Sequence, residues 1–198
     1  MKKRMLEIVL SGGRATSALA LVLTLTACQG VGGIDTSQVS PISNDDTYAT
    51  LGYLWAGART AIESKREPST NAFNLQLSHQ LSCSRGGQGA YQGTLVGNKS
   101  AGTGSAVLAL TATLSECQFD NTVSVTTISA TGFAVSGTVA VTNDVWGAIN
   151  LRMVATTVTV NGKVCPGGVD VVITGTSPSS RPISTGTACG RIGAVPLP

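Results

Sequence analysis

Apolar positions between residues 43 and 66 recur at steps of three and four residues, which is the spacing of one face of a helix. The pattern predicts a single amphipathic helix over 43–66. Ser43–Asp46 resembles a capping box with Asp in place of Glu, and Pro68 is expected to follow the end of the helix. The apolar stripe comprises Leu51, Leu54, Trp55, Ala58 and Ile62.

From residue 72 onward the pattern changes to alternating apolar and polar positions rich in Thr, Val, Ser and Gly. Such alternation between frequent Gly turns indicates β-strands, and Asn161–Gly162 is a strong hairpin signal. Between Met153 and Val158 the apolar positions change parity, which predicts a bulge or a strand buried on both faces. The segments with the clearest alternation are Phe73–Ser78, Val107–Leu114, Phe133–Val141, Ile149–Met153 and Val169–Thr174.

These patterns predict a mainly β fold over 72–198, an antiparallel β-meander of about seven or eight strands. Barrel-like closure, complete or partial, fits best, and a two-sheet sandwich is the alternative. The helix would cover one open face or mouth of this β-body. Together, residues 43–198 are expected to form one domain.

The first 27 residues have the pattern of a secretory signal. Lys2, Lys3 and Arg4 form a basic start, and 15–27 is an uncharged stretch. A membrane-spanning helix needs about 20 apolar residues, so this stretch is too short to span. Its length and small residues fit a cleaved leader.

At the end of this stretch a hydrophobic core, a small residue and a cysteine follow one another in that order. The segment Leu25–Cys28 therefore resembles the lipobox of bacterial lipoproteins. The resemblance covers residues 1–28 and implies cleavage before Cys28, with acyl chains on that cysteine. Two or more acyl chains hold a protein stably at a membrane. In that family, Asp after the cysteine favours the inner membrane; here Gln29 favours the outer membrane of the bacterial envelope. Residues 28–42 would be the acylated cysteine and a flexible tether.

The four cysteines after Cys28 are even in number, and export would place them where disulfides form. Two disulfides are therefore expected rather than free thiols or a metal site. Three connectivities are open, and the sequence-local one is favoured. It pairs Cys83 with Cys117 and Cys165 with Cys189.

Charge and chemistry add little to this picture. Beyond residue 27 the chain has nine basic and nine acidic residues, so it offers no electrostatic reason to bind nucleic acid. No catalytic, cofactor or metal motif is recognised. His79 lies in a predicted strand, Gly97–Ser100 is interpreted as a turn, and Gly86–Gly93 as glycines for turns and bulges. Two acids that could approach one another are Glu116 and Asp120, and two aromatics expected near turns, as exposed platforms for a glycan, are Tyr91 and Trp146.

The resulting hypothesis is a non-enzymatic, membrane-anchored envelope lipoprotein that acts as a structural or interaction module, with an envelope protein as its partner. An alternative is a carrier of an apolar ligand in a β cavity capped by the helix. An envelope hydrolase using His79 is a third hypothesis. The helix stripe either packs on the β-body or forms a ligand or partner face, which would comprise Leu51, Leu54, Trp55 and Ile62.

Overall fold

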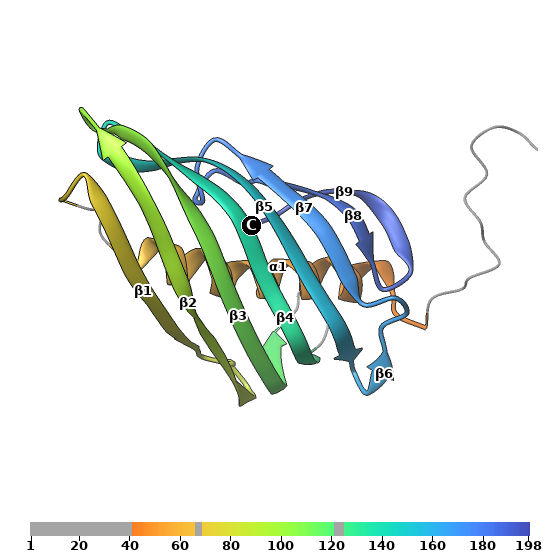
Figure 1. Ribbon diagram of the computed structural model, residues 1–198. Helices are drawn as coiled ribbons and strands as arrows, with labels where there is room; N and C mark the ends of the chain where they lie inside the picture. Colours follow the sequence, from red (N-terminus) through yellow and green to blue (C-terminus); the bar gives the residue numbers. More distant parts are fainter. Residues whose placement is uncertain (1–40, 66–68, 121–124) are drawn as a thin grey trace, which may run out of the picture. The chain divides into compact units, whose positions relative to one another are not determined.

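One antiparallel sheet of nine strands makes up most of the computed structural model, which describes residues 41–65, 69–120 and 125–198 (Figure 1). All of these residues belong to one compact unit. The predicted leader 1–27, Cys28 and the tether up to residue 40 lie outside the described residues.

The strands follow one another in the sheet in the order β1-β2-β3-β4-β5-β7-β8-β9, and β6 pairs with β5. Each neighbouring pair is antiparallel, as a meander requires. The strands are β1 (Ala72–Leu81), β2 (Gly86–Ser100), β3 (Thr103–Asp120), β4 (Val125–Thr142), β5 (Val145–Val160), β6 (Lys163–Val164), β7 (Val169–Gly175), β8 (Ile183–Ala188) and β9 (Arg191–Pro196).

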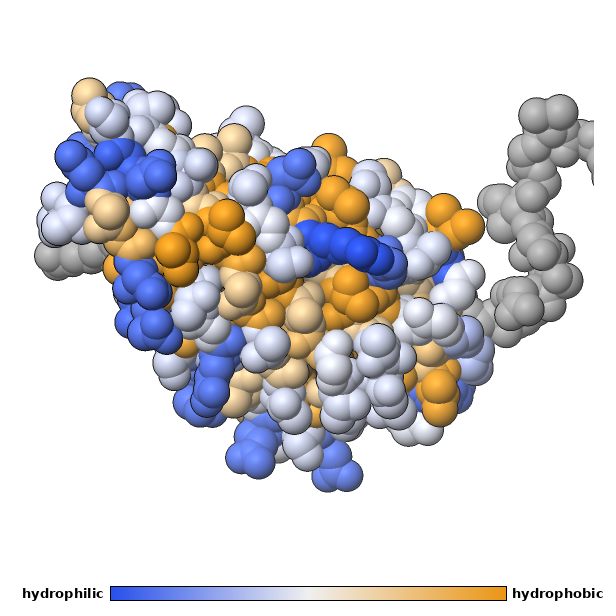
Figure 2. All heavy atoms as spheres, viewed as in Figure 1, coloured by the Kyte–Doolittle hydropathy of each residue, from blue (hydrophilic) through white to orange (hydrophobic). Residues whose placement is uncertain are grey.

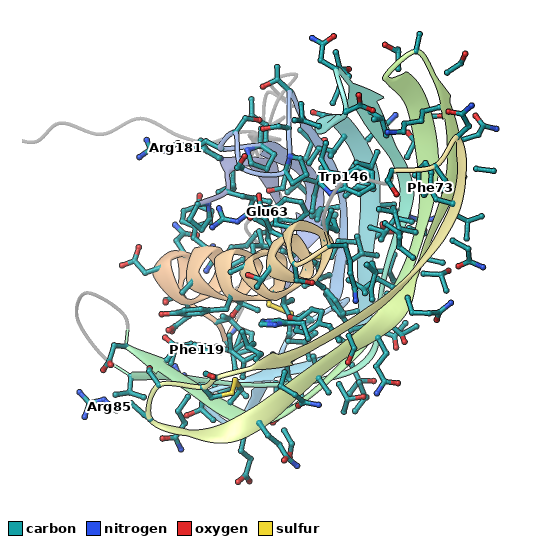
Figure 3. All side chains as sticks on the ribbon, turned by 90° about the vertical axis from the view of Figure 1, so that its left-hand side faces the viewer. Glu63, Phe73, Arg85, Phe119, Trp146 and Arg181 are labelled. Atoms are coloured by element: carbon teal, nitrogen blue, oxygen red, sulfur yellow. A yellow bond between two sulfur atoms is a disulfide. The ribbon has the colours of Figure 1, made fainter. Side chains whose placement is uncertain are left out.

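The predicted antiparallel meander with one N-terminal helix is confirmed, but the sheet does not close. Within the described chain, β1 and β9 are the two ends of one open sheet, so neither a closed barrel nor a second sheet is present. The helix α1 (Asn44–Glu63) lies on the concave face instead (Figure 3). Because the helix covers the inward apolar side chains, the sheet does not have to meet itself to bury them.

Local chemistry explains where α1 begins. The Ser43 side chain accepts a hydrogen bond from the Asp46 backbone N–H at 3.0 Å, and Asp45 and Asp46 lie in the first turn, near the positive end of the helix dipole. The helix ends at Glu63, earlier than the predicted residue 66. Lys65 therefore follows the helix, and its carbonyl accepts a hydrogen bond from Trp146 Nε1.

The sheet curls strongly around the helix. Phe73 on β1 and Trp146 on β5 have ring centroids 6.2 Å apart, although three strands lie between β1 and β5 in the sheet. Glycines that face the concave side permit this curvature. A Cβ on Gly93 would lie 2.1 Å from the Ala109 carbonyl oxygen, and Gly137 has a φ of +141°, which L-residues rarely adopt.

Strand β5 changes the face that it buries at the predicted place, but it pairs with β4 without a register shift there, so the predicted bulge is absent from this pair. The inward positions switch from Ala155 to Val158, and both intervening threonines are exposed. In β4 the inward positions switch in the same way, from Ala130 to Phe133, across Gly132 with its φ of +63°. Strands β4 and β5 change their buried face at the same level of the sheet. The pairing register between them is therefore the same before and after the change.

Candidate interaction surfaces

The four side chains of the predicted ligand or partner face are packed against the sheet. Leu54, Trp55 and Ile62 are fully buried and Leu51 is 3% exposed. All four belong to one continuous apolar core with the inward residues of the strands. A ligand or partner could contact them only if α1 moved away from the concave face.

Tyr91 of β2 joins the sheet to the middle of the helix. Its ring lies over Gly57, where an added Cβ would be only 2.3 Å from the Tyr91 Cζ atom. Its hydroxyl donates to the Leu54 carbonyl oxygen at 3.2 Å, and burial raises the pKa of this phenol. Its ring also stands nearly perpendicular to the Phe133 ring, with ring centroids 5.7 Å apart. Glycine at position 57 is therefore required by the close approach of this ring.

Neither predicted aromatic platform is exposed. Tyr91 is fully buried and Trp146 is 8% exposed, because both occupy inward positions of their strands and face the helix side of the sheet. Alternation along β2 and β5 could have assigned them to that face. The aromatic side chain that is exposed is Tyr48, on the outer side of α1.

The four cysteines of the domain form two disulfides, with the predicted sequence-local pairing. Cys83 in the β1–β2 connection is bonded to Cys117 of β3, with Cα atoms 5.2 Å apart. Cys165, after β6, is bonded to Cys189 in the β8–β9 turn, with Cα atoms 4.4 Å apart. The first disulfide therefore ties the β1–β2 connection to β3, and the second ties the segment after β6 to the β8–β9 turn.

His79 and the two glycine-containing segments considered in the sequence all lie within strands. His79 of β1 is half-buried on the concave side, 6.3 Å from the Tyr91 ring, and burial lowers its pKa. Gly97–Ser100 is strand rather than the predicted turn, because the β2–β3 turn lies at Ala101–Gly102. Gly86–Gly93 also lies within β2, where a register shift between Gly86 and Gln88 supplies the predicted bulge.

The two acids considered as a pair have separate partners. Glu116 has a φ of +45° at an irregularity in β3, and its backbone N–H donates to the Ser129 hydroxyl at 2.9 Å. Asp120 forms an ion pair with Arg85 at 2.8 Å. The structure gives no interaction between the two carboxylates. Within the described ranges, no group of three or more His, Cys, Asp or Glu side chains could hold a metal ion.

The convex face of the sheet is broad and nearly free of charge. Figure 2 shows this face as mainly pale and orange, with blue in isolated areas. Arg152 of β5 and Asp170 of β7 lie within it and form a two-pronged ion pair, at 2.8 and 2.7 Å, which lowers the pKa of Asp170. The exposed apolar side chains on this face include Val96, Val107, Val172 and Ile183.

Two shallow pockets flank the outer side of α1. One, of about 340 Å³, is lined by Glu63, Val145, Trp146, Pro178 and Ser179. The other, of about 260 Å³, is lined by Ala49, Gly52, Tyr53, Ala56 and Pro198.

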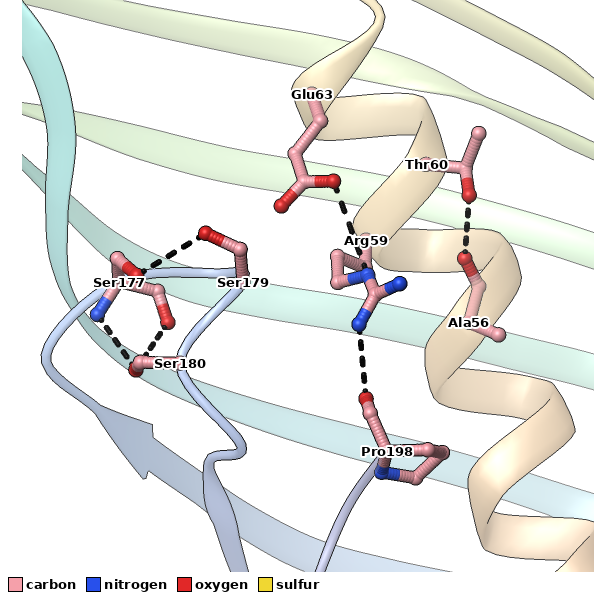
Figure 4. A network of polar contacts seen from close by, with 8 residues as sticks. All are labelled: Ala56, Arg59, Thr60, Glu63, Ser177, Ser179, Ser180 and Pro198. Carbon is pink, nitrogen blue, oxygen red and sulfur yellow. Dashed lines mark hydrogen bonds and ion pairs between the residues drawn. The ribbon is translucent and has the colours of Figure 1, made fainter.

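Polar contacts hold the segments beside these pockets. Arg59 Nη1 donates to the Pro198 carbonyl oxygen at 2.9 Å, and Arg59 Nε lies 3.7 Å from Glu63 Oε2 in an ion pair (Figure 4). Ser180 closes its own turn by donating to the Ser177 carbonyl oxygen at 2.8 Å. The polar groups near the pockets are thus engaged in local structure.

No protein-family model, no curated protein and no solved structure matches the chain. Among the helical residues that the structure describes, no segment is long and apolar enough to cross a membrane.

Proposed function

We infer that this chain is a lipid-anchored protein of the bacterial envelope, whose domain 43–198 binds another protein and has no catalytic role. The observation that carries the proposal is the pairing of the cysteines. The four cysteines of the domain bond to one another in two pairs, so none of them requires Cys28 as a partner. Cys28 follows a lipobox-like sequence, and stable disulfides are typical of exported proteins.

The surface of the domain also supports a binding module. Its convex face is wide, exposes Val, Ile and Thr side chains, and carries Arg152 and Asp170 as a mutually neutralised pair. Exposed apolar side chains gathered on one face are typical of protein interaction sites. A partner could therefore cover this face without removing unpaired charges from water.

Acylation of Cys28 tests the anchor directly. The full chain would be produced in a diderm bacterium fed an alkyne analogue of palmitate, beside Cys28→Ala and a control in which Cys165 and Cys189 are both changed to Ala. We expect label on the parent and on the control, and none on Cys28→Ala. A parent chain that keeps its leader and carries no label would refute the anchor.

The alternative function, a carrier of an apolar ligand, stays a prediction, and it requires the helix to move. Because α1 occupies the concave face, an apolar ligand would need the helix to separate from the sheet, exposing Leu54 and Trp55. Binding of a fluorescent fatty acid, measured on the full chain by titration, distinguishes the two functions. Saturable binding with one site per chain would favour the carrier over the interaction module.

A further inference from the structure

The backbone of β1 is open along one edge of the sheet. The Asn71 carbonyl accepts a hydrogen bond from the Lys99 N–H at 2.7 Å, so odd-numbered residues of β1 direct their backbone groups toward β2. Backbone groups alternate in direction along an antiparallel strand. The even-numbered residues therefore turn their N–H and C=O groups away from the sheet. The Ala72 carbonyl accepts a hydrogen bond from the Thr70 hydroxyl at 2.8 Å. The other four even-numbered residues have no partner strand in the described part of the chain, and they are Asn74, Gln76, Ser78 and Gln80.

The opposite edge is protected in ways that β1 is not. Strand β9 has six residues, contains Gly193 and ends at Pro196, which has no N–H to donate. Strand β1 has ten residues, pairs with β2 without a register shift, and contains no Pro, Gly, Lys, Arg, Asp or Glu. Natural sheets usually block exposed edges by short length, proline, bulges or charge. The β1 edge lacks all four devices.

We propose that β1 pairs with β1 of a second copy of this chain, antiparallel and centred on Leu77, to form a continuous two-molecule sheet. In this register the outward-directed backbone groups of Asn74, Gln76, Ser78 and Gln80 all find partners, giving about eight interchain hydrogen bonds from four residue pairs. The pairs of opposed residues are Asn74 with Gln80, Gln76 with Ser78, Leu75 with His79, Phe73 with Leu81, and Leu77 with itself.

The side chains of β1 favour a copy of the same strand over other occupants. On the convex face the register places amides and a hydroxyl opposite one another, and these groups can both donate and accept. On the concave face it places apolar side chains opposite apolar ones, apart from His79. Leu75 and Leu81 are packed on the core but remain half-exposed at this edge, so a second strand would cover them. Since β1 has no carboxylate, ammonium or guanidinium group, two copies do not repel one another.

The pairing rests on the proposed function only in that an acyl anchor would concentrate the copies on one membrane. A single strand pair is a small interface, so a raised local concentration favours it. Acylation and pairing have separate readouts, and either can fail alone.

Cysteine cross-linking in isolated membranes tests the register. Two differently tagged full chains, one with Gln76→Cys and one with Ser78→Cys, would be produced together and oxidised with copper phenanthroline. In the proposed register the two Cα atoms are about 5.5 Å apart, within disulfide range, whereas the introduced cysteines of two Gln76→Cys chains are diagonal neighbours at about 7–8 Å. We expect the mixed dimer to exceed each single-variant dimer by about fivefold or more.

Two controls separate pairing from chance collision. Ala109→Cys, on the same face but two strands from the edge, should give no cross-link, and neither should the parent chain. A parent chain that cross-links through Cys28 would count against the acyl anchor, not against the strand pairing.

A matched pair of charge variants tests complementarity at the same positions. With Asn74→Lys and Gln80→Lys together, each lysine faces a lysine of the other copy, and we expect the mixed cross-link to fall about tenfold. With Asn74→Lys and Gln80→Glu, each lysine faces a glutamate, and the cross-link should be retained or increased. Asn74 and Gln80 are both exposed in the single molecule, so both variants should fold.

Three results would overturn the pairing. They are equal cross-linking of the mixed and single variants, equal cross-linking of the two charge variants, and cross-linking of the Gln76→Cys chain to a different protein with none between copies. In each case retained palmitate labelling would leave the anchor intact.

Discussion

The ring of Tyr91 lies directly against Gly57, where β2 meets the middle of the helix. This contact sets how closely α1 approaches the sheet. A side chain of any size at position 57 would have to displace the ring, whose hydroxyl also donates to the Leu54 carbonyl oxygen. Helix position, strand position and one buried hydrogen bond are therefore coupled through two residues.

Gly57→Ala is expected to destabilise the protein. Alanine favours a helix over glycine by about 1 kcal/mol, but its Cβ would stand 2.3 Å from Tyr91 Cζ, and such overpacking costs about 1–3 kcal/mol. Gly52→Ala is the control on the same helix, since its Cβ would make an ordinary contact of 3.4 Å with Pro198. Urea unfolding of both should show a loss only for position 57, and equal stabilities would contradict the close contact.

Alkaline pH should weaken the fold through Tyr91. Burial raises the pKa of its phenol in the folded state, while the unfolded chain releases this proton near pH 10. The unfolded state then binds fewer protons, so the free energy of unfolding falls above about pH 10, by up to about 1.4 kcal/mol per pH unit. Tyr91→Phe should be less stable at pH 8 yet show a shallower fall. Equal slopes from pH 9 to 11 would rule out this role.

Gly93 should tolerate no side chain, because its place in the curled sheet leaves no space. A Cβ there would lie 2.1 Å from the Ala109 carbonyl oxygen and 2.7 Å from the Leu110 Cα atom, so backbone must shift. We expect Gly93→Ala to cost about 2 kcal/mol or more. Gly193→Ala in β9, with open space around it, should change stability by less than about 0.5 kcal/mol. Thermal unfolding monitored by circular dichroism compares the two.

Each disulfide should contribute about 3–4 kcal/mol, since they close loops of similar length, with sequence separations of 34 and 24. Their local effects should differ. Replacing Cys83 and Cys117 with Ala frees the connection beside β1, so amide exchange should accelerate in β1. Replacing Cys165 and Cys189 should accelerate exchange around the β8–β9 turn instead. The same exchange pattern in both variants would show that neither disulfide restrains its own segment.

The proposed lipid anchor predicts that the residue after Cys28 directs the protein to one of the two membranes. Because Asp at this position favours the inner membrane in the family whose lipobox Leu25–Cys28 resembles, Gln29→Asp should move the protein from the outer-membrane to the inner-membrane fraction. Gln29→Asn is the control without charge and should stay with the parent. Density-gradient separation of the two membranes measures the distribution, and a parent already in the inner fraction would contradict the outer-membrane assignment.

Much of the domain's local structure follows from the sequence alone. Alternation along residues 73–78 and 133–141 specifies strands with one buried face, and the three- and four-residue spacing of Leu51, Leu54 and Trp55 specifies one apolar helix face. Short turns between strands then make neighbours antiparallel. An even cysteine count with short spacings also pointed to the observed disulfide pairing.

The tertiary structure decided which surfaces these apolar faces of the helix and strands pack against. Periodicity marks Trp55 and Tyr91 as belonging to an apolar face, but it does not name the surface that covers that face. Only the folded chain shows that the helix fills the concave side of an open sheet and buries both residues. It also leaves the outer edge of β1 without a partner strand among the described residues. The physical reason is that burial depends on contacts between segments distant in sequence, whereas alternation and helical spacing report only each segment's own geometry.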